Sequence, residues 1–235
     1  MKEIQMNLDE SRLNSLNNLK DNNNRSQRNI SFKNKLINKI FINSFFYRII
    51  LILFGFKIGK GVKFNGPINF ILNGPIQNID FSEQITFGKN ITIKIRENGK
   101  IILKNKVYID DNVRLVSARD GYIQIGEGTE IGANTIINSG GKLTIGSYCL
   151  ISNNCNINSS THGSKALNFI MDQDHSHGFI NIHDDVWLGG FVTITYNTTI
   201  NEGAIVGANS LVTKDLEKLS INYGCPAIKI SERKT

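Results

Sequence analysis

A bulky aliphatic residue returns at every sixth position between residues 182 and 212 of this chain. The residues are Ile182, Leu188, Ile194, Ile200, Val206 and Val212. A second series, four residues behind the first, has small or β-branched side chains at Val186, Val192, Thr198, Ala204 and Ser210. A period of six belongs neither to a helix nor to a single strand, but it is typical of one flat side of a parallel β-helix. We therefore predict an all-β fold, a parallel β-helix of hexapeptide repeats.

The pattern also sets the limits of the β-helix and of its interruption. It begins at Ile58, Phe64 and Phe70, becomes irregular, is regular again at Ile125, Ile131 and Ile137, slips at Gly140–Gly141, and resumes at Ile145, Ile151 and Ile157. It then stops until Ile182. We predict a β-helix over residues 57–216 with an excursion loop at 159–179, followed by a C-terminal tail at 217–235. If three sides make one coil, residues eighteen apart stack on each other.

The N-terminal part of the chain has a different character. Residues 1–30 are polar and are predicted to form a flexible basic arm. In residues 31–56 apolar side chains recur at three- and four-residue spacings, which predicts an amphipathic α-helical segment that caps the open end of the β-helix. Residues 1–65 carry twelve Lys/Arg and four Asp/Glu, whereas the rest of the chain is nearly neutral. A second role for residues 1–56 is therefore peripheral contact with a membrane or an anionic polymer.

Several classes of protein are disfavoured. The most apolar stretch, residues 41–56, is interrupted by Arg48 and is shorter than the ~20 residues of a spanning helix. No nucleic-acid-binding motif accompanies the basic residues, so nucleic acid is not an expected partner.

Three cysteines without paired spacing favour a reducing compartment. We expect a cytoplasmic protein, with attachment to the inner face of the membrane as the open alternative. Cys149 and Cys155 occupy small inward positions and are predicted core residues.

Four segments, in this order, resemble the hexapeptide-repeat acyltransferases, in particular the galactoside, maltose and polysaccharide O-acetyltransferases. They are Ile145 to Ile151 leading to Ser160-Thr161-His162; Val186 to Gly190; Gly207 to Asp215; and Gly224 to Ala227. The resemblance covers roughly residues 123–231. It implies a left-handed β-helix, a homotrimer with active sites between subunits, and acetyl-CoA as the acyl donor. We expect no metal.

The resemblance also assigns catalytic and acceptor residues. His162 matches the family's catalytic histidine, which would take a proton from a sugar hydroxyl as that hydroxyl attacks the thioester. The galactoside branch uses an asparagine on the facing coil, which corresponds to Asn134, with Asn138 as the alternative. Long loops in a rigid repeat scaffold usually carry function. The excursion loop therefore supplies the predicted acceptor-binding residues, which are Asp172, Asp174, His175 and His177.

A further set is assigned to the cofactor. Trp187 matches a family tryptophan beside the cofactor, and strand alternation directs its side chain out of the core. The residues that line the pantetheine groove in the family correspond to Gly190, Ala208, Thr213 and Lys214. The family's basic residue after its terminal proline corresponds to Ile228 here, so the neighbouring Lys229 is the candidate for phosphate recognition.

The predicted function is transfer of acetyl from acetyl-CoA to a hydroxyl of a saccharide, preferably a surface polysaccharide or its precursor. A small free sugar or a nucleotide-sugar is the alternative acceptor. A γ-type carbonic anhydrase would share the fold, but His162, His175, His177 and His183 lack its ligand spacing. A non-catalytic trimer that binds glycan or membrane is the alternative from another class.

Overall fold

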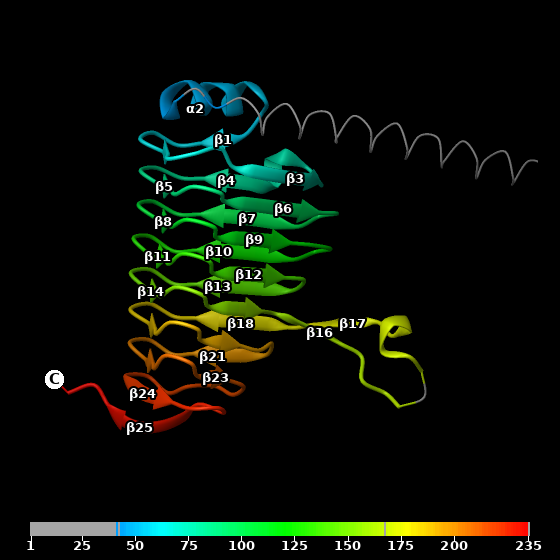
Figure 1. Ribbon diagram of the computed structural model, residues 1–235, viewed down its shortest axis with the longest axis vertical. Coiled ribbons are helices and arrows are strands. Elements are labelled where there is room, and N and C mark those ends of the chain that lie inside the picture. The colour runs from blue at the N-terminus through cyan, green and yellow to red at the C-terminus, as the bar shows by residue number, and fades with distance from the viewer. Residues whose placement is uncertain (1–40, 42, 167, 235) are drawn as a thin grey trace, which may run out of the picture.

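The chain forms a left-handed parallel β-helix, a prism with three sheets as its sides (Figure 1). This computed structural model describes residues 41, 43–166 and 168–234. The predicted basic arm at 1–30 and the first part of the predicted helical segment, residues 31–40, lie outside the described residues.

Each coil contributes one strand to each of three sheets, in the chain order A, B, C. Sheet A contains β1 (Lys57–Ile58), β4 (Ile79–Phe81), β7 (Lys100–Leu103), β10 (Tyr122–Ile125), β13 (Lys142–Ile145), β18 (Phe179–Ile182) and β21 (Thr198–Ile200). Sheet B contains β2 (Lys63–Phe64), β5 (Thr86–Phe87), β8 (Tyr108–Ile109), β11 (Glu130–Ile131), β14 (Leu150–Ile151), β19 (Trp187–Leu188), β22 (Ile205–Val206), β24 (Ser220–Tyr223) and β25 (Ile228–Glu232). Sheet C contains β3 (Asn69–Asn73), β6 (Thr92–Arg96), β9 (Arg114–Ser117), β12 (Ile136–Ser139), β15 (Asn156–Asn158), β20 (Thr193–Ile194) and β23 (Leu211–Val212).

The six-residue series forms the core of the prism. Ile182 aligns with Ile200 and Leu188 with Val206 on the next coil, which confirms the predicted stacking of residues eighteen apart. Both series, large and small, are buried over residues 182–212. Cys149 and Cys155 are also buried, as predicted, and burial raises the pKa of each thiol to about 11. Both thiols are therefore neutral core groups.

The irregularity of the early coils is confined to one corner of the prism. Inward residues keep the spacing of six from sheet A to sheet C, as in Phe81, Phe87 and Ile93. Extra residues enter only at the corner where the chain leaves sheet C for sheet A, which we call the third corner. Ile58 consequently aligns with Phe81 on the second coil, 23 residues later, instead of eighteen.

A helix closes the N-terminal end of the prism (Figure 1). Helix α2 (Ser44–Leu53) is capped by Asn43, whose side chain accepts a hydrogen bond from the Phe46 backbone N–H. Tyr47 and Leu51, one turn apart, are fully buried against the first coil. Within the residues the structure describes, no helix has both the length and the hydropathy needed to cross a bilayer.

At the other end the C-terminal residues extend sheet B. Strand β24 pairs in parallel with β22, and β25 then pairs antiparallel with β24. The turn between them contains Gly224 to Ala227. The antiparallel β25 covers the exposed edge that a parallel strand would leave at this end.

Candidate functional site

The excursion from the prism is an ordered hairpin that projects from the third corner (Figure 1). Strands β16 (Ser160–His162) and β17 (His175–His177) pair antiparallel, and the short 3-10 helix η2 (Ile170–Asp172) lies in the segment that joins them. His162 is directly opposite His175, and Ser160 is opposite His177. The hairpin register thus brings three of the four histidines together.

The imidazoles of the hairpin form one cluster. The ring centroids of His162 and His175 are 4.0 Å apart, and those of His175 and His177 are 6.0 Å apart. The Oγ atom of Ser160 lies 2.9 Å from Nδ1 of His177. His162 is exposed and open to a ligand. In the described part of the chain, no group of three or more His, Cys, Asp or Glu side chains could hold a metal ion.

The glycine pair at the base of the hairpin makes room for this cluster. A Cβ atom on Gly140 would overlap Nδ1 of His177 and the Oγ of Ser160, and one on Gly141 would overlap the carbonyl of Gly178. The slip in the sequence pattern at Gly140–Gly141 is therefore the point where the hairpin packs onto the preceding coil.

Asp172 and Asp174 lie farther out on the hairpin and are exposed. Asp172 is the last residue of η2, and its backbone N–H donates to the Phe169 carbonyl at 3.0 Å. The Asp174 carbonyl accepts from the Gly163 N–H, also at 3.0 Å. Both side chains are thus on the same excursion as the histidine cluster.

The pKa of His177 is lowered by burial and by the nearby charges of Arg119 and His175. Its neutral form is therefore favoured in the folded protein. Neutral His177 therefore contributes to the free energy of unfolding above the ordinary pKa of histidine. This contribution is lost as the pH falls through the lowered pKa of His177. We expect Arg119→Ser to raise the titration midpoint of His177 in an imidazole NMR titration. Arg114→Ser, an exposed arginine on β9, is the control. An unchanged midpoint in Arg119→Ser would exclude the charge effect.

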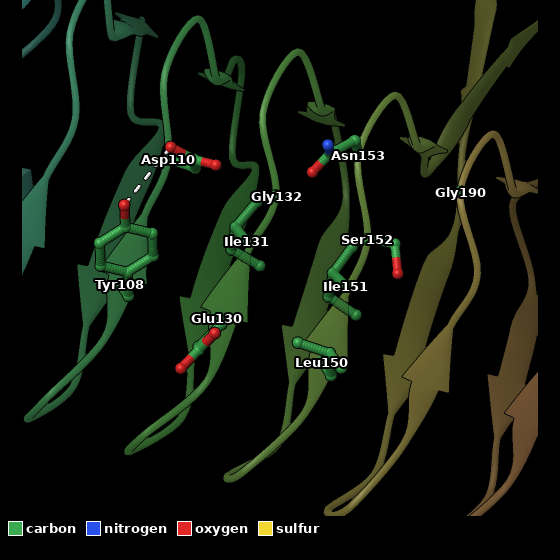
Figure 2. A pocket seen from close by; sticks show the side chains of 10 residues that line it. All are labelled: Tyr108, Asp110, Glu130, Ile131, Gly132, Leu150, Ile151, Ser152, Asn153 and Gly190. Carbon is green, nitrogen blue, oxygen red and sulfur yellow. Dashed lines mark hydrogen bonds between the residues drawn. The ribbon is translucent and has the colours of Figure 1, made fainter.

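A groove of about 410 Å³ crosses the outer face of sheet B (Figure 2). It is lined by Tyr108, Asp110, Glu130, Ile131, Gly132, Leu150, Ile151, Ser152, Asn153 and Gly190. Tyr108, Glu130, Leu150 and Trp187 align across four successive strands. Trp187 is 46% exposed, so the prediction that its side chain points outward is confirmed. Its Nε1 donates to the Oγ of Ser152 at 3.3 Å, which links Trp187 to the groove.

The corner between sheets B and C, the second corner, has left-handed backbone on six coils. The residues with positive φ are Asn90, Asn112, Asn134, Asn154, Phe191 and Asn209. Asparagine tolerates this conformation, so the column supplies a backbone reason for an asparagine at 134. The Asn134 N–H donates to the Asp111 carbonyl of the preceding coil at 3.0 Å. The alternative, Asn138, lies on β12 and aligns with Asn158.

Phe191 is the exception in this column. Its φ is 61°, a conformation that is uncommon for a bulky residue, and its side chain is 60% exposed. It follows Gly190, whose carbonyl accepts from the Asn209 N–H of the next coil, and Ala208 precedes Asn209 there. Gly190 and Ala208 therefore lie on successive coils at the second corner. Strain beside a candidate groove marks Phe191 as a functional candidate.

The remaining predicted cofactor residues lie elsewhere. Thr213 and Lys214 directly follow β23 and are exposed at the third corner. Lys229 lies on β25, where its Nζ contacts the carboxylates of Glu217 at 2.7 Å and Glu232 at 2.5 Å. These hydrogen bonds raise the pKa of Lys229. In the single chain Lys229 is therefore already ion-paired.

Apart from Lys229 on β25, the structure thus collects the predicted residues into two groups on different corners of one prism. His162, His175 and His177 are on the hairpin at the third corner, and Thr213 and Lys214 are at the same corner two coils later. Trp187, Gly190 and Ala208 follow sheet B and the second corner. Apart from Gly190, the residues that line the groove were missed from the sequence. The feature that identifies them is their alignment with Trp187 on neighbouring strands. This alignment can be worked out only when the length of each coil is known from the structure.

Comparison with known proteins supports a common family for this fold and motif set. Residues 179–214 match the family model of the bacterial transferase hexapeptide (six repeats). The dTDP-4-amino-4,6-dideoxy-D-glucose acyltransferase of Escherichia coli is 31% identical over 156 residues, which are 62% of this chain and 81% of that protein. The chain belongs to the hexapeptide-repeat acyltransferases. It is therefore an acyltransferase, although it spans only about half the length of other curated acetyltransferases that it matches.

Solved structures share the fold of this acyltransferase. A variant of AntD, an N-acyltransferase from Bacillus cereus, in complex with dTDP-4-amino-4,6-dideoxyglucose and coenzyme A, is 24% identical with a TM-score of 0.59. The match covers 83% of this chain and 93% of that one. The polysialic acid O-acetyltransferase OatWY is 20% identical with a TM-score of 0.51, over 76% and 91% of the two chains.

Proposed function

We propose that this acyltransferase moves an acetyl group from acetyl-CoA to a hydroxyl of a saccharide in active sites shared by neighbouring subunits of a homotrimer. The observation that carries the proposal is the separation of the histidine hairpin from the Trp187 groove on one prism. If prisms pack side by side around a threefold axis, the hairpin of one subunit can meet the groove of the next. The apolar end of the hairpin supports this packing, because Phe169, Ile170 and Met171 are 79%, 63% and 85% exposed in the single chain.

His162 is the general base in this proposal. A sugar hydroxyl is a weak nucleophile at neutral pH, and a neutral imidazole can remove its proton during attack. The hydroxyl oxygen bonds to the thioester carbonyl carbon, the C–S bond then breaks, and the CoA thiolate leaves and is protonated. Attack is direct in this proposal, and Cys149 and Cys155, as buried neutral thiols, are not available to carry the acetyl group. Asn134 is retained as a second catalytic candidate in the trimer, although its corner position has its own backbone explanation.

Acetyl-CoA would lie along the outer face of sheet B and the second corner. Trp187 offers an exposed ring to the pantetheine, and Gly190 and Ala208 allow close approach to the backbone. Thr213 and Lys214 of a neighbouring subunit would contact the anionic end of CoA. Lys229 would have to release Glu217 or Glu232 to bind phosphate, which makes it a weaker candidate than Lys214. No metal enters the proposed chemistry.

Phe191 tests whether the strained corner serves the donor. Asparagine tolerates left-handed backbone better, so we expect Phe191→Asn to raise the free energy of unfolding by about 1 kcal/mol and to raise the KM for acetyl-CoA. Denaturant unfolding and steady-state kinetics give the two values. Asn154→Phe at the same corner is the reverse control and should lower stability by a similar amount. Unchanged KM in Phe191→Asn would remove Phe191 from the donor site.

A surface polysaccharide or its precursor is the preferred acceptor, contacted by Asp172, Asp174, His175 and His177 on the hairpin. The basic, apolar N-terminal part of the chain supports this preference, because it suits work beside a membrane where such precursors are assembled. The buried free thiols favour a cytoplasmic location at the inner face of that membrane. The curated relative that acts on a dTDP-amino-sugar favours a second candidate, in which a nucleotide-sugar is the acceptor.

The deciding experiment is an acceptor panel scored by release of free CoA thiol. The panel contains polysaccharides, their lipid-linked precursors, free sugars and nucleotide-sugars, including an amino-sugar. Thiol release with a polysaccharide or precursor alone supports the preferred acceptor, and release with a nucleotide-sugar alone supports the second. Absence of release with all acceptors, with no CoA binding, would favour the non-catalytic binding trimer. Zinc-dependent hydration of CO₂, without thioester turnover, would favour the carbonic anhydrase alternative.

A further inference from the structure

Helix α2 lies at the N-terminal end of the prism (Figure 1), and its outer face is apolar. Phe45, Phe46, Ile49, Ile52 and Leu53 are 64%, 51%, 37%, 41% and 81% exposed. Spacings of three, four and seven residues place them on one side of the helix. The opposite side is anchored in the prism. Five large apolar side chains on a ten-residue helix are more than scattered surface residues, so this face is a contact surface.

The anchoring contacts fix the orientation of the helix. The Tyr47 hydroxyl accepts a hydrogen bond from the Ile68 N–H at 3.1 Å, and its ring meets that of Phe64 edge-on, with centroids 5.1 Å apart. Arg48 Nε donates to the Gly59 carbonyl at 3.1 Å, and the Ser44 Oγ accepts from the Phe64 N–H at 2.8 Å. The exposed face therefore cannot turn inward without breaking these contacts.

Charge in this part of the chain has one sign. No Asp or Glu occurs between Asp21 and Asp80, whereas the same interval contains nine Lys/Arg. In the described residues, Lys57, Lys60 and Lys63 are exposed on the first coil, beside the helix. An apolar helical face bordered by cations matches the interface of a bilayer that contains anionic lipids.

We propose that α2 docks the protein on an anionic lipid bilayer, with Phe45, Phe46, Ile49, Ile52 and Leu53 entering the interface and Lys57, Lys60 and Lys63 facing the headgroups. A ten-residue helix rises ~15 Å, about half of the hydrocarbon thickness, so it lies in the interface and does not cross it. The prism then stands with its N-terminal end on the membrane. This inference does not depend on the catalytic proposal.

Two other occupants fit less well. A second copy of this face would bring clusters of lysine together with no acid to pair with them. An anionic polysaccharide would neutralise the lysines but would leave the five apolar side chains in water. A lipid surface satisfies both the apolar and the charged groups.

The test is cosedimentation of the full chain with vesicles. We expect binding to phosphatidylglycerol/phosphatidylcholine vesicles, weakened by high salt, and much less binding to pure phosphatidylcholine. Phe45→Ser/Leu53→Ser should lower the partition coefficient at least tenfold, roughly the effect of losing two buried apolar side chains. Ile228→Ser/Ile230→Ser is the matched control, because these isoleucines are 64% and 60% exposed at the opposite end of the prism, and it should bind like the wild type.

Several results would overturn the proposal. They are absence of wild-type binding, equal binding by Phe45→Ser/Leu53→Ser, or binding that ignores lipid charge and salt. A fall in molecular mass of Phe45→Ser/Leu53→Ser without any vesicle binding by the wild type would instead assign the face to a second copy. Circular dichroism verifies folding and should not change in either variant. Thiol release with a soluble acceptor should not change in Phe45→Ser/Leu53→Ser.

Discussion

Replacing His162 with alanine should lower kcat for acyl transfer by about 10²- to 10⁴-fold, the usual contribution of a general base. The KM for acetyl-CoA should remain within about twofold, because the donor contacts proposed for Trp187 and Gly190 are made by another part of the fold. Stopped assays of CoA thiol release with a working acceptor measure both constants. Isothermal titration with CoA checks that the donor still binds.

His183→Ala is the matched control for this prediction. His183 is an exposed histidine that follows β18, outside the hairpin. Its backbone N–H donates to the Ile200 carbonyl at 2.9 Å, and its carbonyl accepts from the Cys149 thiol at 3.0 Å. This variant should keep nearly full activity. If His162→Ala retained more than a tenth of wild-type kcat, His162 would not be the base. A large loss in His175→Ala instead would move the role to the ring 4.0 Å away.

The sequence predicts the fold well because every coil of the β-helix repeats the same pattern of inward residues. Each inward residue stacks on an equivalent residue of the next coil, so a six-residue pattern is a direct consequence of the packing. The early coils are harder to recognise in the sequence, because added residues at the third corner interrupt the otherwise constant six-residue spacing of inward residues. Residues at a corner project into solvent, and lengthening a surface loop costs little free energy.

The histidine hairpin is the largest of these insertions at the third corner. Ile145 aligns with Ile182 on the next coil, 37 residues later, whereas the previous coil advances 20 residues from Ile125 to Ile145. The missing repeats between 157 and 182 could locate the loop from the sequence. They could not show that His162 pairs with His175, because a loop without a repeat contains no register signal.

The groove on sheet B could not be predicted from the sequence for a related reason. Tyr108, Glu130, Leu150 and Trp187 are neighbours in space, but they are separated in sequence by three different coil lengths. Phe191 carried a local signal, an aromatic residue where other coils have asparagine. That signal becomes readable only after the corners are aligned. In the proposed homotrimer, a single chain also does not reveal which subunit supplies which half of the site, and this question leads to the second large prediction.

Mixed trimers of two inactive variants should regain activity. His162→Ala lacks the base, and Trp187→Ala lacks the proposed donor contact. If one site combines the hairpin of one subunit with the groove of its neighbour, random 1:1 mixing leaves about a quarter of the sites intact. We therefore expect co-expressed variants to show roughly a quarter of wild-type turnover, measured at acetyl-CoA concentrations below the wild-type KM, where each variant alone is nearly inactive.

The control is a mixture of the two separately purified variants, assayed before subunits have time to exchange. This mixture should stay inactive. Native mass spectrometry of the co-expressed protein, with one variant tagged, verifies that mixed trimers form. Mixed trimers without recovered turnover would mean that His162 and Trp187 serve sites within one chain or do not serve one site at all. Recovery, in contrast, requires that the two corners of the prism meet across a subunit boundary, because neither variant chain contains both side chains.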